Sequence, residues 1–493
     1  MRYRVPEWYR DAKLGITVHW GVPTIPTYAP IEHGTRTDML RDQHWPFYFR
    51  HHPNAEWYLN SLRISDSPVR RYHRARFGEY TAYERLARRF NDELDRWKPA
   101  EWAGLFREAG ARYVIMVAKD HDGFLMWPSE TPPATPSFVA VRDVVGELAG
   151  AVRELGMRYG VSYSGRLDWT VQHAPIRDFG DLVFAESSSD YSRYVDAHLT
   201  DLVRRYSPDL LRSDIGLPAG VSRRSLFEHY REAVPEGVLN DGWQLNGGST
   251  RAMLRTKAGR HLLGRKARTA FLSGSPPCGI GDVPTVEYPA AIRMRANPWE
   301  LVRGLGRSFC YNAAEPASSY LTGEELIHLL ADVVSKNGNL LLNVAPCADG
   351  SICAEQISAL NALAGWMRVH GEAIYGTRPW FRADGLTADG LDIRYTVREN
   401  ALYAIVLGRP RMLALTLEDL DLDRVPRAGS ASDDDHFHVR LLGHDGPVDW
   451  REEGKSVVID IPGSFIPDAA IVAKFEWRDS PDRRMDRFYT DVI

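Results

Sequence analysis

Several apolar runs of the sequence end in residues that could do chemistry. The run from Leu14 to Val18 stops at His19 and Trp20, and a proline-broken loop follows at once. Three later runs end in the same way. Lys119, Asp120, His121 and Asp122 stand at the end of the first of these, Tyr163, Asp168 and Trp169 at the end of the second, and Asp214 at the end of the third. An apolar run cut off by turn-forming residues is typical of a strand, so these side chains should stand where the chain leaves a sheet. Each alone could be a scaffold histidine or a helix cap, but their shared placement favours a functional site.

Two classes of reaction could use such a set of side chains. A metal hydrolase would need clustered ligands, typically in an HxH or HExxH pattern, and neither pattern occurs. The adjacent His51 and His52 lie in a polar stretch and do not change this. Hydrolysis of a glycoside needs two carboxyl groups together with aromatic planes and hydrogen-bonding groups that hold a sugar. These ingredients are present, so we expect no metal site.

Elements of alternating type surround these residues up to about residue 380. The segment 99–111 has Trp102, Leu105 and Phe106 on one helical face, and residues 112–119 then predict a buried strand. The same helix and strand pattern recurs at 143–165, 194–214 and 323–346. Repeated units of this kind predict a parallel sheet with helices outside, with a (β/α)8-like barrel as first choice. A doubly wound open sheet is the alternative, weakened by the lack of a GxGxxG turn after any predicted strand.

The pattern changes beyond residue 380. Short runs of strand type, separated by Gly, Pro, Asn and Asp, predict an antiparallel β-sandwich. We therefore divide the chain into a catalytic barrel over 1–380 and a sandwich over 381–493. Residues 242–297 show little pattern and predict a long loop.

Composition narrows the partners and the location. The 493 residues carry a formal net charge of −4, which gives no electrostatic reason to expect nucleic acid or an anionic membrane as partner. The four cysteines form no CxxC pair, and we expect free thiols. The polar N-terminus has no apolar signal core, which predicts a cytoplasmic protein. The sequence leaves open whether the protein forms a homo-oligomer.

Longer motifs add a family resemblance. The segments WYRDAKLGITVHWG, EWY, FNDELDRWKPAEWAGLFREAGARYVIMVAKDHDGF, YSGRLDW, NPWELVRGLGRSFCYN and DVVSKNGNLLLNVAPCADGSI occur in this order. Together they resemble the family 29 glycoside hydrolases, the α-L-fucosidases, over most of residues 7–380. The resemblance implies a (β/α)8-like barrel followed by a β-sandwich, a retaining double displacement, no cofactor, and a small-molecule glycoside or oligosaccharide as substrate.

The resemblance also implies roles for individual residues. The nucleophile falls on Asp214, and the acid/base falls on Glu287 in PTVEYP, with Glu300 in NPWEL as the alternative. In a retaining enzyme the two carboxyl groups should lie roughly 5 to 5.5 Å apart. The sugar-binding residues fall on His19, Glu56, Trp57, His121 and Tyr163.

Three positions depart from the family pattern. Asp120 stands where the family has the first histidine of KHHDGF, Arg212 where a tryptophan stands two before the nucleophile, and Gly242 where an arginine often follows. We include Asp120 and Arg212 among the substrate-binding residues. Such changes alter which hydroxyls a pocket can satisfy, so the glycone could be another α-L-sugar, or a deoxysugar on a small natural product. A non-catalytic carbohydrate-binding homologue is the alternative from a different class.

Overall fold

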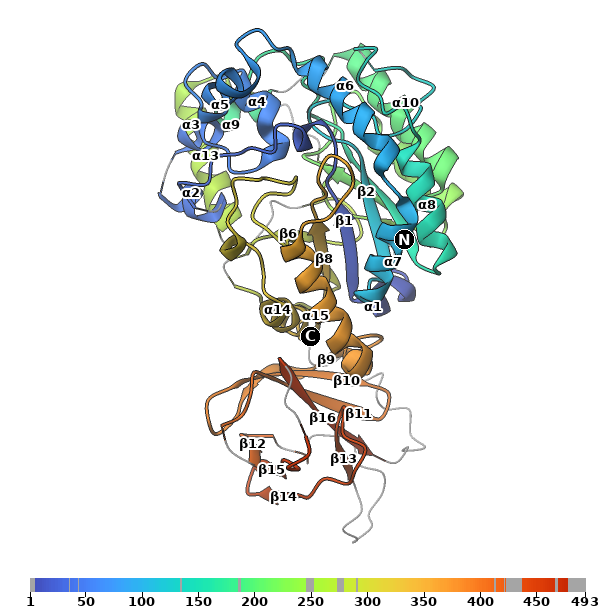
Figure 1. The fold of residues 1–493 in the computed structure, drawn as a ribbon, viewed down its shortest axis with the longest axis vertical. Helices are drawn as coiled ribbons and strands as arrows, with labels where there is room; N and C mark the ends of the chain where they lie inside the picture. Colours follow the sequence, from blue (N-terminus) through green and yellow to red (C-terminus); the bar gives the residue numbers. More distant parts are fainter. Residues whose placement is uncertain are drawn as a thin grey trace.

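The computed structural model describes residues 5–34, 36–42, 44–133, 135–184, 188–244, 252–272, 279–289, 291–411, 414–420, 422, 437–465 and 469–477. The chain forms an α/β part and, at its C-terminal end, a smaller all-β part (Figure 1). The chemistry predicted from the sequence falls in the first part.

Eight parallel strands build the α/β part. They are β1 (Leu14–Val18), β2 (Tyr113–Lys119), β3 (Arg158–Ser164), β4 (Leu210–Asp214), β5 (Val238–Leu239), β6 (Thr285–Glu287), β7 (Trp299–Gly304) and β8 (Gly338–Val344). Their order is β5-β4-β3-β2-β1-β8-β7-β6. The segments next to the edge strands β5 and β6 are joined by two isolated parallel bridges, Asn240 with Val283 and Gly242 with Ile280. The predicted (β/α)8-like barrel is confirmed, and the open doubly wound sheet is wrong.

Helices on the outside bury one face against the strands. They are α7 (Pro99–Glu108), α8 (Val144–Glu154), α10 (Ser189–Tyr206), α11 (Arg223–Ala233), α14 (Gly323–Ser335) and α15 (Ala354–His370). In α7 the buried residues are Trp102, Ala103 and Phe106, which follow the helical period seen in the sequence. The strand that follows, β2, is buried at every position, because a parallel strand is covered on both faces.

A long excursion separates β1 from β2. It contains α2 (Arg36–Asp42), α3 (Trp45–Arg50), α4 (Tyr58–Leu62), α5 (Pro68–Phe77) and α6 (Tyr83–Glu93), with short 3₁₀ turns η1 (Val22–Thr24), η2 (Ala55–Trp57) and η3 (Leu94–Arg96). Helices α2 to α5 gather at the end of the barrel that lies away from the all-β part (Figure 1). This is the end where the barrel strands finish, so the excursion can contribute walls to a site there.

The prediction of a long loop over 242–297 is wrong in its middle. Helix α13 (Lys257–Leu272) lies there and packs beside α2 and α9 (Phe179–Val183). Its Gly264 carbonyl accepts a hydrogen bond from Trp45 Nε1 at 2.8 Å, and Arg260 pairs with Asp178 at 3.2 Å. Two glycines and several charged residues hide the apolar face in the sequence, and tertiary contacts with the excursion stabilise the helix. Residues 245–251, 273–278 and 290 lie outside the described residues.

Two antiparallel sheets form the C-terminal part. The larger has the order β13-β16-β11-β10-β9 and the smaller β12-β15-β14. The bounds are β9 (Arg378–Leu386), β10 (Asp392–Arg398), β11 (Ala401–Leu407), β12 (Ala414–Leu417), β13 (Phe437–Leu441), β14 (Trp450–Glu453), β15 (Ser456–Asp460) and β16 (Ala470–Trp477). The two sheets share one apolar core, to which β11 contributes Val406 and β15 contributes Ile459. A core shared between two sheets is typical of a sandwich. Since β9 starts at Arg378, the predicted boundary at residue 380 falls inside this strand.

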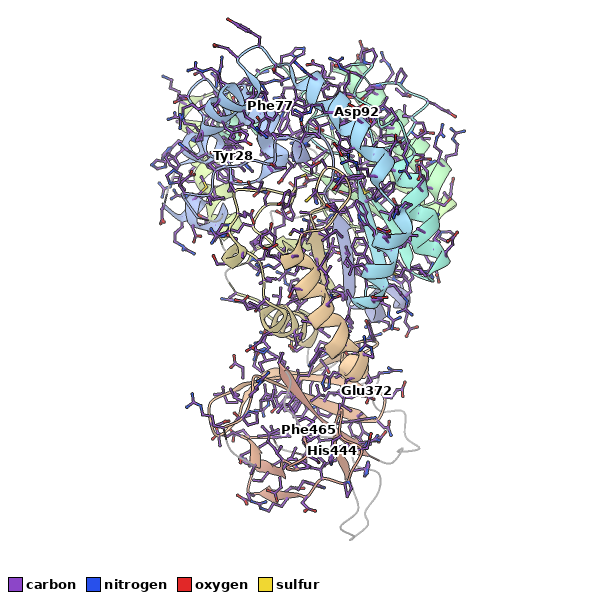
Figure 2. All side chains as sticks on the ribbon, viewed as in Figure 1. Tyr28, Phe77, Asp92, Glu372, His444 and Phe465 are labelled. Atoms are coloured by element: carbon purple, nitrogen blue, oxygen red, sulfur yellow. The ribbon has the colours of Figure 1, made fainter. Side chains whose placement is uncertain are left out.

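Side-chain contacts fix the two parts to one another. Trp366 Nε1 donates to the carbonyl of Ala470 at 2.9 Å, and Lys474 Nζ lies 3.1 Å from a carboxylate oxygen of Glu372. Figure 2 places Glu372 at this junction, while His444 and Phe465 lie within the all-β part. The described cysteines, Cys310, Cys347 and Cys353, are free thiols as predicted, and Cys278 lies outside the described residues. In the described part of the chain, no helix combines the length and apolarity needed to span a bilayer.

Candidate active site

The ends of the barrel strands bring most of the predicted residues to one rim. Asp214 is the last residue of β4 and Glu287 the last of β6, while His19 follows β1 and His121 follows β2. The register pairs Asp214 with Ser164, the last residue of β3. Parallel strands end at the same side of a barrel, so these side chains surround one opening.

The carboxylate of Asp214 is accessible at this rim. Its side chain is 41% exposed, and Nε2 of His121 lies 3.6 Å from Oδ2. This distance is too long for a hydrogen bond, so His121 does not occupy the carboxylate oxygen. Burial lowers the pKa of His121, although the charge of Asp214 acts in the opposite direction. A neutral imidazole beside an open carboxylate leaves Asp214 able to approach a bound substrate.

The hydrogen-bond pattern around His121 fixes its tautomer. Ser164 Oγ donates to the carbonyl of Leu167 at 3.3 Å, so it accepts from Nδ1–H of His121 at 2.7 Å. Nε2 of the neutral ring therefore carries a lone pair and faces Asp214 and the opening.

His19 has an equally well-defined orientation. Nδ2 of Asn343 donates to the carbonyl of Phe309 at 2.7 Å, which turns Oδ1 of Asn343 toward Nδ1 of His19 at 2.6 Å. Nδ1 of His19 therefore carries the proton, and Nε2 can accept a hydrogen bond from a hydroxyl. Burial lowers the pKa of His19, which keeps the ring neutral. The ring stacks on Phe309 with centroids 4.9 Å apart.

Glu56 and Trp57 come to the site from η2 in the excursion. The indole of Trp57 packs edge to face against His121, with ring centroids 5.2 Å apart, and stacks on His52 at 4.4 Å. Glu56 is buried, and its Oε2 accepts the backbone N–H of Cys310 at 3.2 Å. Burial, with a contribution from Asp120, raises the pKa of Glu56 to about 8. At neutral pH this carboxyl group is mostly protonated and can both donate and accept hydrogen bonds.

Glu300 lies in a different environment from the rim. It is the second residue of β7, near the opposite end of the strand, and it is buried. Oε1 accepts from the hydroxyls of Tyr9 at 2.9 Å and Tyr113 at 3.0 Å, and Oε2 binds the guanidinium of Arg212. Both oxygens are occupied and the group is held beside a cation. These contacts argue against Glu300 as a proton donor to a leaving group.

Arg212 links this buried network to the rim. It lies two residues before Asp214 on β4, so both side chains point to the same face of the strand. Its burial acts to lower the pKa of Arg212, but the charges of Glu300, Glu287 and Asp214 outweigh this and raise it. Arg212 is therefore a fixed positive charge within electrostatic reach of the expected nucleophile and of Glu287.

Glu287 ends β6 at a sharp turn. The next residue, Tyr288, has a φ of 44°, in the left-handed region that a bulky residue rarely adopts. The hydroxyl of Tyr288 fixes this turn by accepting the backbone N–H of Gly304 at 2.8 Å. The charge of Glu287 acts on the pKa values of both His121 and Arg212. Glu287 therefore belongs electrostatically to the same rim as Asp214.

Tyr163 is not brought together with the other predicted residues. Its hydroxyl lies 3.0 Å from Nδ1 of His198 on helix α10, and the side chain is buried against the outer layer. Because strand residues alternate, its neighbours Ser162 and Ser164 take the inner face of β3 instead. This placement argues against a contact between Tyr163 and the sugar, which stays a prediction.

Two residues that position the site were not singled out in the sequence. Asn343 and Ser164 orient His19 and His121, respectively. Each is a polar residue at or next to the end of a buried strand, and that signal could have marked them. Below them, Lys119 Nζ donates to the carbonyls of Ser164 at 2.8 Å and Leu167 at 3.0 Å, and thereby fixes the turn after β3.

Comparisons with known proteins agree with this geometry. The family model described as Alpha-L-fucosidase matches residues 1–372. The chain belongs to the α-L-fucosidase family. Human tissue α-L-fucosidase is 27% identical over 498 residues, which cover 96% of this chain and 88% of that protein. A Thermotoga maritima α-L-fucosynthase in complex with a fucosyl-fucose azide superposes with a TM-score of 0.80 at 36% identity, covering 96% of this chain and 97% of the other. The T. maritima α-fucosidase in complex with fucose gives a TM-score of 0.77 at 34% identity over the same shares.

Against the pattern of the α-L-fucosidase family, the three departures have different structural settings. The side chain of Asp120 is 16% exposed, its Oδ1 accepts the backbone N–H of His121 at 2.7 Å, and partial burial raises its pKa. Gly242 cannot be replaced by the family's arginine without a backbone shift, since a Cβ there would lie 2.0 Å from the carbonyl oxygen of Ser213. Arg212 lies two residues before the expected nucleophile, Asp214, and places a charged side chain on the same face of β4. Within the described ranges, no three His, Cys, Asp or Glu side chains cluster as a metal ion would require, and the prediction that none is needed stays a prediction.

Proposed function

We propose that the protein is a retaining exo-glycosidase that hydrolyses α-L-fucosides, or glycosides of a closely related α-L-sugar. The observation that carries this is the exposed carboxylate of Asp214 at the end of β4, beside two neutral, oriented imidazoles, in a chain of the α-L-fucosidase family. The T. maritima enzyme with fucose bound supports the choice of sugar.

In the proposed mechanism Asp214 is the nucleophile and Glu287 the acid/base. A carboxylate oxygen of Asp214 attacks the anomeric carbon while the bond to the leaving oxygen breaks, and Glu287 transfers its proton to that oxygen. Glu287, now ionised, takes a proton from water, and the water oxygen displaces Asp214 from the anomeric carbon. The product keeps the configuration of the substrate. Arg212, two residues before Asp214 on the same face of β4, places a positive charge near the reacting groups.

The sugar would be held by the groups whose orientations are defined. Nε2 of His19 accepts from a hydroxyl, the protonated carboxyl of Glu56 donates to one, and Trp57 supplies an apolar surface. Asp120 offers acceptors where the family has an imidazole, which is the specific reason to keep another α-L-sugar, or a deoxysugar on a small natural product, as a second candidate.

A panel of aryl α-L-glycosides tests the proposal. Turnover of the fucoside, with NMR showing the α-anomer as first product, is expected. An inverted first product would overturn the retaining mechanism. Faster turnover of another aryl α-L-glycoside would assign the specificity to that sugar in place of fucose. Lack of turnover across the panel would favour the non-catalytic carbohydrate-binding alternative.

The location and assembly remain predictions. A cytoplasmic location is supported by the three free cysteines among the described residues, because disulfides are rare in reducing compartments. Size-exclusion chromatography with light scattering would establish whether a homo-oligomer forms.

A further inference from the structure

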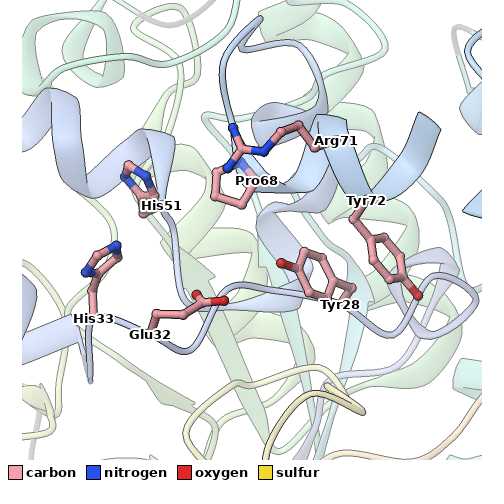
Figure 3. Close-up of a pocket in the computed structure, with 7 residues that line it drawn as sticks. All are labelled: Tyr28, Glu32, His33, His51, Pro68, Arg71 and Tyr72. Atoms are coloured by element: carbon pink, nitrogen blue, oxygen red, sulfur yellow. The ribbon is translucent and has the colours of Figure 1, made fainter. Parts of the chain in front are cut away.

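A second pocket lies in the excursion between β1 and β2, and it shares no residue with the candidate active site. It has a volume of about 560 Å³ and is lined by Tyr28, Glu32, His33, His51, Pro68, Arg71 and Tyr72 (Figure 3). Ligand pockets are commonly about 300 to 1,000 Å³ in volume. The pocket is thus large enough for a small ligand.

Two opposite charges face this pocket without pairing. Arg71 on α5 donates to the backbone carbonyl of Asp66 at 3.0 Å. Among the described residues neither Arg71 nor Glu32 forms an ion pair, and both are exposed. Figure 3 shows the guanidinium of Arg71, the carboxylate of Glu32 and the hydroxyl of Tyr28 around the same space. The pocket therefore offers donors on one side and acceptors on the other, with no net charge from these two residues.

The aromatic side of the pocket is held by ring stacking and by a hydrogen bond. The rings of Tyr28 and Tyr72 stack with centroids 4.0 Å apart at 9°, and the Tyr72 hydroxyl donates to the carbonyl of Pro26 at 3.0 Å. His33 and His51 pack edge to face at 5.0 Å and close the other side. A sugar combines C–H surface with hydroxyls that both donate and accept, and it matches such a mixture of aromatic carbon, donors and acceptors.

The pocket is next to the candidate active site. His51 lines the pocket, and the following residue, His52, stacks on Trp57. The loop that carries Tyr28 is tied to the loop after β7, because the backbone N–H of Ala29 donates to Oδ1 of Asn312 at 3.2 Å. The same loop after β7 donates to Glu56 through Cys310. Both sites are therefore built on one connected framework.

We propose that this pocket is a separate carbohydrate-binding site, which holds one neutral sugar unit of a glycan away from the bond that is cleaved. The proposal rests on the proposed function only in taking the glycan to be a substrate. Arg71 and Glu32 would each hydrogen-bond hydroxyls of the unit, and the ring of Tyr28 would contact its C–H surface.

Binding to the full-length protein tests this site separately from cleavage. Galactose, glucose and N-acetylglucosamine are titrated by ligand-observed NMR in the presence of excess L-fucose, with glucuronic acid as an anionic comparison. At least one neutral sugar should bind. Arg71→Gln and Glu32→Gln should each weaken that binding about tenfold, as expected for loss of a hydrogen bond to a charged group. Arg70→Gln and Glu79→Gln change exposed charges outside the pocket and should have no effect.

Hydrolysis of small aryl glycosides should be unchanged in Arg71→Gln and Glu32→Gln, because these substrates do not reach the pocket. Absence of neutral-sugar binding would overturn the proposal. Effects of opposite sign on binding in Arg71→Gln and Glu32→Gln would also overturn it, because they would indicate a charged ligand. A loss of aryl glycoside turnover in these variants would overturn it too, because it would place the pocket in the cleavage site. Sugar binding in an enzyme inactive on the whole panel would overturn the proposed function and leave this site standing.

Discussion

Asp214 and Glu300 are two carboxylates of the same barrel, near the same arginine, in contrasting surroundings. The side chain of Glu300 is 3% exposed and is bonded by two tyrosine hydroxyls and Arg212. The side chain of Asp214 is 41% exposed, with His121 3.6 Å away. A carboxylate whose oxygens are all bonded stabilises the barrel interior, whereas a carboxylate with open oxygens can meet a substrate. The contrast supports the proposal that Asp214 reacts with the substrate and that Glu300 stabilises the barrel interior.

The largest effect is expected from Asp214→Gly. Loss of the carboxylate that attacks the anomeric carbon should lower kcat by several orders of magnitude on every glycoside, and azide should partly restore turnover by taking its place. Steady-state kinetics with and without azide check this. Since the side chain is on the rim, the melting temperature should change little, and a collapse of stability would show that Asp214 resembles Glu300 after all.

Glu287→Ala should give a large effect that depends on the leaving group. A nitrophenolate leaves with little help, whereas a sugar alkoxide needs a proton, so kcat/KM should fall far more on natural glycosides than on nitrophenyl glycosides. Glu300→Ala should lower activity about equally on both substrates, through disturbance of the barrel. The leaving-group signature in Glu300→Ala would exchange the two roles; its absence from both variants would direct the search to Glu56.

Glu300→Gln should sharpen the contrast through stability. Removing the charge leaves the buried guanidinium of Arg212 without its closest partner, which costs about 3 kcal/mol or more of unfolding free energy. Glu287→Gln, at a less buried position, should cost less than about 1 kcal/mol. Thermal unfolding of the two variants beside the parent measures this. Equal losses would contradict the division between interior and rim.

The sequence predicts the features of this fold and site that depend on local pattern, and it does not predict those that depend on contacts between distant residues. The βα order, the sandwich strands and the rim positions of His19, His121 and Asp214 come from local pattern, because buried strands and their end residues leave a clear trace. The direction of Tyr163 depends on a single step of strand alternation, and the helix α13 depends on contacts with α2 and α9. The network of Glu300 joins residues from α1 (Glu7–Ala12), β2, β4 and β7, far apart in the chain. Local pattern carries no information about such a meeting.

Glu56 offers a third case, a buried carboxyl group that forms no ion pair among the described residues. Its pKa of about 8 when folded lies above its ordinary value of 4.5. Between these values the unfolded chain has released the proton and the folded chain keeps it. Stability should therefore fall as pH rises from 4.5 to 8, by up to about 1.4 kcal/mol per pH unit. Below pH 4.5 and above pH 8 the contribution of Glu56 to the free energy of unfolding does not change with pH.

Comparison with Glu56→Gln isolates this contribution, since glutamine cannot titrate. The difference in unfolding free energy between the parent and this variant should shift against the parent as pH rises through the window, measured by urea unfolding at several pH values. A difference that stays constant from pH 4.5 to 8 would show that Glu56 is ionised in the folded protein and is paired as Glu300 is.

The smallest effect is expected from Asp120→His, which restores the family's residue. The carboxylate of Asp120 lies among His19, His121 and Asp214 and only accepts hydrogen bonds when ionised, whereas a neutral imidazole both donates and accepts. The change should alter the ranking of aryl α-L-glycosides by about tenfold, equivalent to one hydrogen bond, and should favour the fucoside. The ratio of kcat/KM values across the panel measures it. An exposed site outside the rim, Asp66→His, serves as the control. If the ranking is unchanged in Asp120→His, the carboxylate of Asp120 does not determine sugar specificity. Its role would then be structural, like that of Glu300, through the hydrogen bond that it accepts from the backbone N–H of His121.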